Sequence, residues 1–424
     1  LSVLWRRQWK VAPEDRRSRA PRVMPVTILV LNSGGSSLKY RLYAMPDEAV
    51  VCSGHIDRLG TERAVLTHRV PGRADQVLAQ PVLDHLAGIR LVLDLLCHPE
   101  HGVLTSLDEL AAVAHKLPHG GEDATGAVRI DSRTIAALER YAAVVPVHNP
   151  PVLRAVAALA ELLPDTPQCG TFETHFHVTL SPAAWRYALP DDWYHEHGIR
   201  RYGFHSCSHR FVTGRVAELL GRPAGELRTI ICHLGSGTSV CGVRRGQSVE
   251  ISSAFTPQSG TPMSTRSGDF DPFVLTYLMA EAGLSAAELN DRLTRESGLA
   301  GLSGVGGDLR DIEAAAASGN TRAQTAIEVF VWSVRRWIGS CLMATGGLDA
   351  LAFTGGIGEN DALLRDLVCR DLDWLGLKLD RGLNLAGPEG LISSPDSAVS
   401  VLTVNTDEEI VVARDAYATL TGTL

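Results

Sequence analysis

Apolar segments of strand length alternate with helical patterns along most of the chain, which predicts an α/β fold. The clearest helical pattern covers residues 321–345, where apolar side chains recur at steps of three and four residues. We expect this helix to end at Gly346 and Gly347 and a buried strand to follow at 349–355. Further helices are predicted at 85–97, 133–143, 151–163, 272–282 and 408–420.

Two segments follow the same plan of apolar strand, small polar loop and second apolar strand. They are ILVLNSGGSSLKYRL at 28–42 and TIICHLGSGTSVCGV at 229–243, and one shift of 202 residues aligns Gly35–Leu38 with Gly237–Val240. The chain has 424 residues, more than the roughly 250–300 at which a single core stops growing. We therefore expect two related domains, each opening on a hairpin with a polar tip.

The two loops also suggest chemistry. Small residues let successive backbone N–H groups converge on an anion, so two such loops facing one cleft could bind a polyphosphate. Ordinary hairpin turns use the same residues, and neither loop has the spacing of a P-loop. A third glycine-rich segment, AFTGGIGEN at 352–360, lies between the predicted strand and a helix expected to open near Asp361. Glycines at such a junction allow close approach of a phosphate or a flat ring.

Composition and charge narrow the classes of partner. The formal net charge of −8 argues against nucleic acid or an anionic membrane, and no apolar stretch approaches the ~20 residues of a membrane span. The eight cysteines are scattered without a C-x-x-C pair, which is typical of reduced thiols in a cytoplasmic protein. Residues 1–23 carry seven Lys or Arg, and we expect a disordered or non-native extension before Met24. A signal peptide is the alternative, but the apolar run at 26–31 is too short for one.

Seven motifs, taken together and in order, resemble the acetate kinases, the acetokinase branch of the sugar kinase, Hsp70 and actin superfamily. They are VLNSGGSSLKY, HNPP, YGFHSCSH, HLGSG, TRSGDFDP, FTGGIGEN and TDEE. The resemblance implies two duplicated actin/ribonuclease H-like domains around an ATP cleft. Residues 24–175 with 409–424 would form the N-terminal domain, and 176–408 the C-terminal domain that binds nucleotide and dimerises. It also implies a cytoplasmic homodimer that uses Mg²⁺, with Mn²⁺ as an alternative.

The resemblance assigns expected roles to the matching residues. The catalytic set is Glu173, Arg266 and His205, of which His205 and Arg266 would stabilise the transition state. The set that binds the carboxylate or acyl phosphate is Lys116, Arg266, Phe204, Val147, Pro118 and Pro257. The nucleotide set is Lys39, His233, Leu234, Gly235, Ser236, Gly237, Asp308, Leu309, Arg310, Gly356, Ile357, Gly358 and Asn360. The metal set is Asn32 and Glu408, with Glu173 nearby, and His148 matches a further active-site histidine.

Four positions depart from the family pattern. Lys116 and Glu173 stand where arginine and aspartate are usual, and Ser236 and Gly35 replace asparagine and serine. Lysine keeps the positive charge of arginine but lacks the planar guanidinium that can donate two parallel hydrogen bonds. The extra methylene of Glu173 moves its carboxylate further from the backbone than that of an aspartate. Because all four changes keep charge or polarity or simplify to glycine, we expect an active enzyme. The expected reaction is reversible transfer of the ATP γ-phosphoryl to acetate, giving acetyl phosphate and ADP.

Three alternatives remain at this stage. A propionate or butyrate kinase is one, because Pro118 stands in the acyl pocket where valine is usual. A catalytically impaired ATP-binding homologue is the second, given the four departures. A metal hydrolase is the third, since close histidine pairs occur at 175/177, 195/197 and 205/209, although the H-E-x-x-H spacing is missing.

Overall fold

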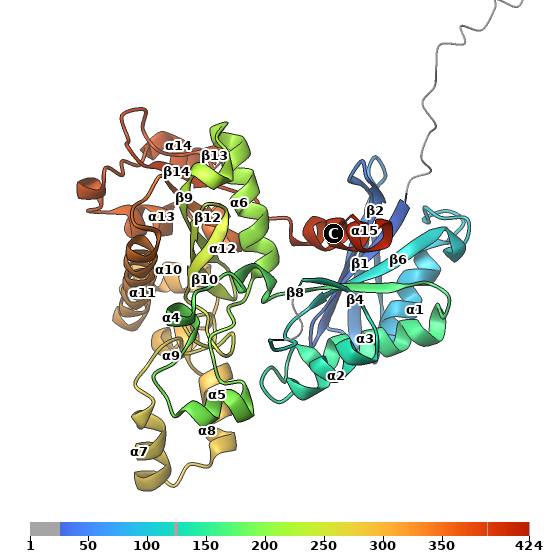
Figure 1. Cartoon of the computed structure of the whole chain (residues 1–424), viewed down its shortest axis with the longest axis horizontal. Coiled ribbons are helices and arrows are strands. Elements are labelled where there is room, and N and C mark those ends of the chain that lie inside the picture. The colour runs from blue at the N-terminus through green and yellow to red at the C-terminus, as the bar shows by residue number, and fades with distance from the viewer. Residues whose placement is uncertain (1–25, 123–125, 388, 424) are drawn as a thin grey trace, which may run out of the picture.

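The structure is a computed structural model that describes residues 26–122, 126–387 and 389–423. The expectations for residues 1–23 lie outside this range. Figure 1 shows two lobes, each built around one twisted sheet, with the C-terminal helix returning to the lobe that contains the N-terminal strands. None of the helices in these ranges is both long enough and apolar enough to cross a lipid bilayer.

Both sheets contain the same core of three antiparallel strands followed by two parallel ones. In the first sheet this core is β3-β2-β1-β6-β8, and in the second it is β11-β10-β9-β12-β14. The first sheet runs β5 (Gln76–Val82), β4 (Thr61–Arg69), β3 (Ala49–Asp57), β2 (Ser37–Met45), β1 (Val26–Ser33), β6 (Leu110–Leu117), β8 (Gln168–Phe172) and β7 (Ala127–Arg129). The second runs β11 (Gln247–Ile251), β10 (Thr238–Arg244), β9 (Arg228–Leu234), β12 (Ala350–Thr354), β14 (Ser400–Thr403) and β13 (Gly390–Leu391). The predicted α/β fold with duplicated halves is confirmed.

The two opening hairpins differ by one residue at their tips. In the first, Ser33 pairs with Leu38 across the four residues Gly34–Ser37. In the second, Leu234 pairs with Thr238 across the three residues Gly235–Gly237. Matching these closing pairs sets Ser33 beside Leu234 and Leu38 beside Thr238, so no single shift, including that of 202 residues, aligns both strands of the hairpins. The longer first loop is the reason, because one extra residue offsets the two strands it joins.

Alternation along β1 explains how the first lobe is layered. Leu29 and Leu31 lie in the core beneath α1 and α3, whereas Ile28 and Val30 face the opposite side, against α15. Side chains of a strand point alternately to its two faces, so an unbroken apolar run predicts a strand covered on both sides. The covering helices are α1 (His85–Leu96), α3 (Asn149–Leu162) and α15 (Glu408–Thr421). The C-terminal helix thus completes the core of the first lobe.

The second sheet is covered in the same way. Ile230 and Cys232 face α11, and Ile231 faces α6. The helices of this lobe include α6 (Ser206–Leu220), α7 (Phe273–Glu281), α8 (Ala286–Arg295), α9 (Gly298–Ser303), α10 (Leu309–Ala317), α11 (Thr321–Thr345), α13 (Ala362–Cys369) and α14 (Arg381–Ala386). The first lobe also contains α2 (Ser132–Arg140), and α4 (Pro182–Trp185) and α5 (Asp191–His197) belong to the second lobe (Figure 1). The predicted helices and the strand at 349–355 are confirmed to within three residues at each end.

The third glycine-rich segment is not the loop that the sequence suggested. Residues 355–360 form a helix, α12 (Gly355–Asn360), and Asp361 then caps α13 by accepting from the backbone N–H of Leu364 at 2.9 Å. Gly355 has φ +77°, and a Cβ there would lie 2.7 Å from the carbonyl oxygen of Leu234. A side chain is excluded, so the start of α12 sits directly against the end of β9. Arg365, only 1% exposed, donates to the carbonyl oxygens of Gly358 and Glu359 at 2.9 Å and holds the helix from below.

Candidate active site

A cavity of about 210 Å³ lies between the lobes, at the tips of both hairpins. We call it the interlobe cavity. Residues from both lobes line it: Asn32, Ser33, Gly34, Lys116, Pro118, Val145, His148, Glu173, Phe204, His205, Gly237, Pro257 and Arg266. The first lobe contributes the end of β1 and β6, and the second contributes the tip of the second hairpin and the loop that carries Arg266. Residues far apart in the sequence therefore share one enclosed polar space.

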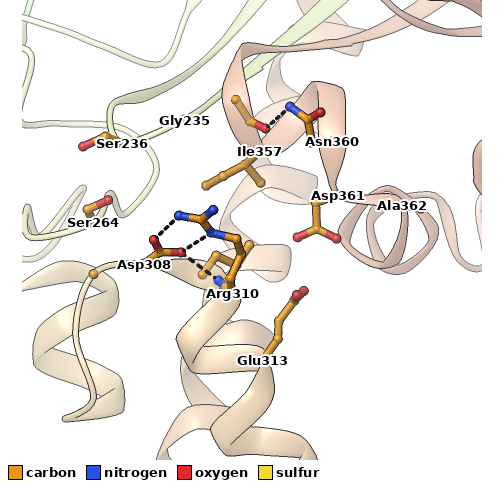
Figure 2. Close-up of a pocket in the computed structure, with 13 residues that line it drawn as sticks. Gly235, Ser236, Ser264, Asp308, Arg310, Glu313, Ile357, Asn360, Asp361 and Ala362 are labelled. Carbon is orange, nitrogen blue, oxygen red and sulfur yellow. Dashed lines mark hydrogen bonds and ion pairs between the residues drawn. The ribbon is translucent and has the colours of Figure 1, made fainter. Parts of the chain in front are cut away.

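A larger cavity of about 580 Å³ opens within the second lobe (Figure 2). We call it the second-lobe cavity, and its lining residues are Gly235, Ser236, Ser264, Gly307, Asp308, Leu309, Arg310, Glu313, Gly356, Ile357, Asn360, Asp361 and Ala362. Gly235 and Ser236 border this cavity, while Gly237 of the same loop borders the interlobe cavity. A molecule lying over this loop would reach from one cavity to the other.

Several predicted site residues line neither of these two cavities. Val147, expected in the acyl pocket, lies outside with its side chain 47% exposed, and Val145 lines the interlobe cavity instead. Leu234 is fully buried in the core beneath the hairpin tip, and Gly358 packs inside α12 against Phe353 and Cys232. Neither of these can present a side chain to a ligand. Lys39 lies on β2 opposite Asn32, with an exposed side chain.

Three charged groups form a compact cluster at the interlobe cavity. The Nζ of Lys116 lies 2.6 Å from Oε2 of Glu408 and 3.7 Å from Oε1 of Glu173. Burial alone would lower the pKa of Lys116, but the two carboxylates raise it well above its ordinary value. Burial would raise the pKa of Glu408, yet the adjacent ammonium group lowers it to about 2. For Glu173 burial dominates, and its pKa is raised.

This cluster also fits a hard divalent cation. Glu173 is 6% exposed, and its Oε1 has no hydrogen-bond partner among the described residues. Glu173, Asn32 and Lys116 line the same cavity, and Glu408 contacts Lys116, so oxygen ligands from β1, from the residue after β8 and from α15 converge here. No group of three or more His, Cys, Asp or Glu suited to a metal occurs in the described ranges. Mg²⁺ binds through one or two carboxylates and takes its other oxygens from water and phosphates, so this sparse set suits it.

Arg266 supplies a positive charge that is not matched by a carboxylate. Its guanidinium donates to the carbonyl oxygen of Pro257 at 3.4 Å, and no ion pair to it is found in the described part of the chain. Burial lowers its pKa, because a charged group loses hydration there. A planar guanidinium with free donors is suited to bidentate contact with a carboxylate or a phosphate. This group gives the cavity a positively charged donor that an anion can use.

His205 is held in an uncommon backbone conformation at the start of α6. It has φ 59°, in the left-handed region, which non-glycine residues adopt only when surrounding structure enforces it. Its ring stacks on that of His233 with centroids 4.5 Å apart. Burial, then the neighbouring His233, Lys116 and Arg266, lower its pKa well below the ordinary value, so the imidazole is neutral. A Cβ on Gly237 would lie 3.2 Å from its Nε2, so this nitrogen faces the hairpin tip.

The second-lobe cavity contains a pair of carboxylates that the sequence did not point to. Figure 2 shows Glu313 of α10 and Asp361 at the start of α13 with their carboxylates directed toward each other. Burial, together with Asp361, raises the pKa of Glu313 to about 7. At the start of the same helix α10, Arg310 donates to both carboxylate oxygens of Asp308, at 3.0 and 2.6 Å. Because Glu313 and Asp361 are 48 residues apart, no local spacing could have revealed their pairing.

Comparison with known proteins shows similarity along nearly the whole chain. The model of the Acetokinase family matches residues 27–414. The chain is 43% identical over 389 residues to the acetate kinase of Carboxydothermus hydrogenoformans, covering 92% of this chain and 98% of that protein. It is 45% identical over 388 residues to the propionate kinase of Citrobacter rodentium, covering 92% and 95%. A crystal structure of Porphyromonas gingivalis acetate kinase matches with a TM-score of 0.86 at 40% identity, covering 93% of this chain and all of that one.

Replacing Glu313 by glutamine should stabilise the fold in a pH-dependent way. A carboxyl whose pKa is raised from 4.5 to about 7 on folding loses stability as pH rises between these values, and the full penalty is present above pH 7. We expect Glu313→Gln to raise the melting temperature by roughly 1–3 °C at pH 8 and by less at pH 5. Thermal unfolding at both pH values, with Glu226→Gln as a control outside the cavity, measures this. An equal effect at both pH values would contradict the assignment.

Removing the ammonium group of Lys116 should strengthen metal binding. Lys116 neutralises Glu408 and Glu173, so a cation entering between them must overcome its repulsion. We expect Lys116→Met to raise the affinity for Mn²⁺ about tenfold or more, measured by calorimetry or electron paramagnetic resonance without nucleotide. The exposed pair Lys378–Asp396 provides a matched control, since Lys378→Met should leave Mn²⁺ affinity unchanged. Unchanged or weaker binding in Lys116→Met would show that these carboxylates do not hold the ion.

Proposed function

This chain belongs to the acetokinase family, and on that basis we propose that it transfers the γ-phosphoryl group of ATP reversibly to acetate, giving acetyl phosphate and ADP. One structural observation supports the proposal in addition to family membership. The loop Gly235–Gly237 borders both cavities, so a nucleotide in the second-lobe cavity could extend its phosphates over the loop toward Arg266. The second-lobe cavity, at about 580 Å³, is also of a size suited to a nucleotide.

The nucleotide would be held mainly by backbone and by the walls of the second-lobe cavity. Ser236, Gly237 and Gly356 would offer backbone N–H groups without bulky side chains in the way, whereas the N–H of Gly235 donates to the Gly237 carbonyl oxygen at 3.1 Å and holds the loop in shape. Asp308, Leu309, Arg310, Ile357 and Asn360 line the remaining walls. His233 and Leu234 on β9, and Gly358 on α12, would act by positioning the loop Gly235–Gly237. Lys39 lies on β2 of the first hairpin and would act from the other lobe.

The chemical step needs positioning and charge neutralisation. A carboxylate oxygen of acetate attacks the γ-phosphorus, a P–O bond forms, and the bond to the β-phosphate oxygen breaks as ADP leaves with the electron pair. The acceptor is already an anion, so no general base is required. Arg266 would orient the carboxylate and, with His205, donate to the equatorial phosphoryl oxygens. Closure of the two lobes would exclude water that could otherwise hydrolyse ATP.

Lys116, Glu173, Glu408 and Asn32 would act together as the charge-balancing group. We propose that Asn32, Glu173 and Glu408 hold Mg²⁺, with Mn²⁺ as an alternative, and that the ion neutralises charge on the transferring phosphoryl group. Lys116 is then free to face the incoming anion, since its carboxylate partners have another cation. His148, whose pKa is lowered to about 4 by burial and by Arg266 and Lys116, stays neutral beside them.

Propionate is the second candidate acceptor. The 45% identity to the Citrobacter rodentium propionate kinase is as high as that to the acetate kinases described above. Pro118, Val145, Phe204 and Pro257 supply the apolar lining of the interlobe cavity, where the acyl chain would lie. Relative turnover of acetate, propionate and butyrate by the purified protein decides between the two assignments.

We also propose a cytoplasmic homodimer formed through the second lobe, with residues 24–175 plus 409–424 and 176–408 as the two domains. Helix α7 has no buried residue, and Phe273 and Tyr277 on it are 75% and 64% exposed. Trp332 on α11 is 72% exposed and lines a groove of about 520 Å³ between α9 and α11. Large apolar side chains exposed on α7 and on α11 are typical of a surface that a second copy covers.

Activity and the role of Arg266 can be measured together. The purified protein with ATP, Mg²⁺, acetate and hydroxylamine should form acetohydroxamate. Arg266→Gln should lower kcat/KM for acetate by about 10²–10³-fold, because it removes donors to both reacting anions. Arg295→Gln changes an exposed arginine, 71% accessible and paired with Asp291 on the surface of α8, and should keep full activity. Absence of hydroxamate with every C2–C4 acid would instead favour a catalytically impaired ATP-binding protein.

The dimer can be tested at the exposed face of α7. The double variant Phe273→Glu/Tyr277→Glu places two charges on this face and should convert a dimer to a monomer in light scattering after size-exclusion chromatography. Val77→Glu, at a 62% exposed position on the edge of the first sheet, should stay dimeric. A double variant that remains dimeric would place the interface elsewhere.

A further inference from the structure

We propose that Ser239 and His209 form a hydrogen-bond chain that keeps the proton of neutral His205 on Nε2, so that His205 presents a hydrogen-bond donor to the interlobe cavity. The inference rests on the proposed function for its catalytic meaning, but the protonation pattern itself can be measured without activity. Ser239 and His209 would thus be positioning residues, acting on the reaction only through His205. Neither residue lines the interlobe cavity.

The chain is built from one hydroxyl between two imidazoles. The Oγ of Ser239 lies 2.8 Å from Nδ1 of His205 and 2.7 Å from Nε2 of His209. Ser239 and His209 are both fully buried, at 0% exposure. Ser239 stands on β10 directly opposite His233 of β9, just beyond the second hairpin tip. The hairpin that would bind the phosphates therefore also carries the residue that contacts His205.

Counting protons selects one arrangement. A serine hydroxyl has one hydrogen, so Ser239 can donate to only one of its two partners and must accept from the other. The Nδ1 of His209 is buried and has no hydrogen-bond partner in the described ranges. A proton on that nitrogen would leave a buried N–H unpaired, which is the more costly choice. The proton of His209 therefore lies on Nε2 and is donated to Ser239.

The direction of the hydrogen bond between Ser239 and His205 then follows. Since Ser239 accepts from His209, its own hydrogen is free to point at Nδ1 of His205, which must be the unprotonated nitrogen. The single proton of a neutral His205 is left on Nε2. This is the nitrogen that lies close to Gly237 and faces the interlobe cavity. The left-handed backbone of His205 sets the direction of the ring, and Ser239 sets which nitrogen carries the proton.

The surroundings keep both histidines neutral. Besides burial, the groups that lower the pKa of His205 are His233, Lys116, Arg266 and His177, and the hydrogen-bond partner of its Nδ1 is a hydroxyl rather than a carboxylate. His209 faces His177, His233 and His205, with ring centroids of His177 and His233 at 5.7 and 6.2 Å. Burial without a carboxylate partner disfavours an imidazolium at either position. A neutral donor of this kind works without a proton from solution, so His205 need not titrate for the reaction to proceed.

The direct test is the ¹⁵N spectrum of histidine-labelled protein at pH 7. Two-bond ¹H–¹⁵N correlations distinguish the two neutral tautomers and the imidazolium, and the signals of His205 are identified by their absence in His205→Gln. We expect His205 with a protonated Nε2 and a bare Nδ1. A protonated Nδ1, or two protonated nitrogens, would overturn the proposal, and the variant serves only to assign the signals of the unaltered protein.

Kinetics of variants provide the second test. Ser239→Ala removes the donor to Nδ1, so part of the population should shift its proton to that atom, and kcat should fall about 10- to 100-fold with little change in KM. His209→Gln places an amide N–H where Nε2–H was and should retain activity within a few-fold, while the shorter His209→Asn should behave like Ser239→Ala. Ser248→Ala is the matched control, because Ser248 is equally buried and bonds Nδ1 of His177 at 2.8 Å. It should leave the His205 signals unchanged.

The outcomes separate this inference from the proposed function. If the wild-type protein shows the expected tautomer but no kinase activity, the hydrogen-bond chain stands and the proposed reaction fails. If the protein is active and His205 carries its proton on Nδ1, the inference fails and the proposed reaction stands. Equal loss of activity in His209→Gln and His209→Asn, with both folded, would also count against the chain.

Discussion

The site depends on the close approach of backbone segments at the tip of the second hairpin, where Gly355 leaves no room for a side chain and Gly237 leaves little. A Cβ on Gly355 would lie 2.7 Å from the Leu234 carbonyl oxygen, and one on Gly237 would lie 3.2 Å from Nε2 of His205. These two close contacts bring the start of α12 and the start of α6 against the hairpin loop Gly235–Gly237. Both cavities and the orientation of His205 follow from this packing, since each borders the same three-residue loop.

Around this backbone scaffold the protein arranges charge in a low-dielectric space. Arg266 and Lys116 bring two positive charges to the interlobe cavity, and Glu173 and Glu408 bring two negative ones. The ammonium group of Lys116 lies close to both carboxylates. An arginine at this position would contact them with a planar guanidinium, and therefore with a different geometry. Lys116 and Glu173 are both departures from the family pattern, and here they contact each other, at 3.7 Å. Glu173 is longer than the usual aspartate, and Lys116 has a smaller charged group than the usual arginine. The two changes together therefore keep the cation and the carboxylate within contact distance.

The buried histidines add donors without adding charge. His205, His209 and His177 all have pKa values lowered by burial, and each has a serine hydroxyl within hydrogen-bond distance of a ring nitrogen. A serine partner fixes a tautomer without stabilising an imidazolium, whereas a carboxylate partner would do both. The cavity therefore keeps its positive charge on Lys116 and Arg266, where an anionic substrate can use it.

The sequence by itself determined the elements and the motifs of this protein. Apolar spacing located α11 and the other long helices, because helix formation depends on residues within one or two turns. The resemblance to acetate kinases named Asn32, Arg266 and His205, which line one cavity in the structure. Only the tertiary structure decided that Val145 rather than Val147 lines that cavity, that Glu313 meets Asp361, and that Ser239 joins His205 to His209. Such pairings depend on side-chain directions across strands and helices that are distant in the chain, and no local pattern encodes them.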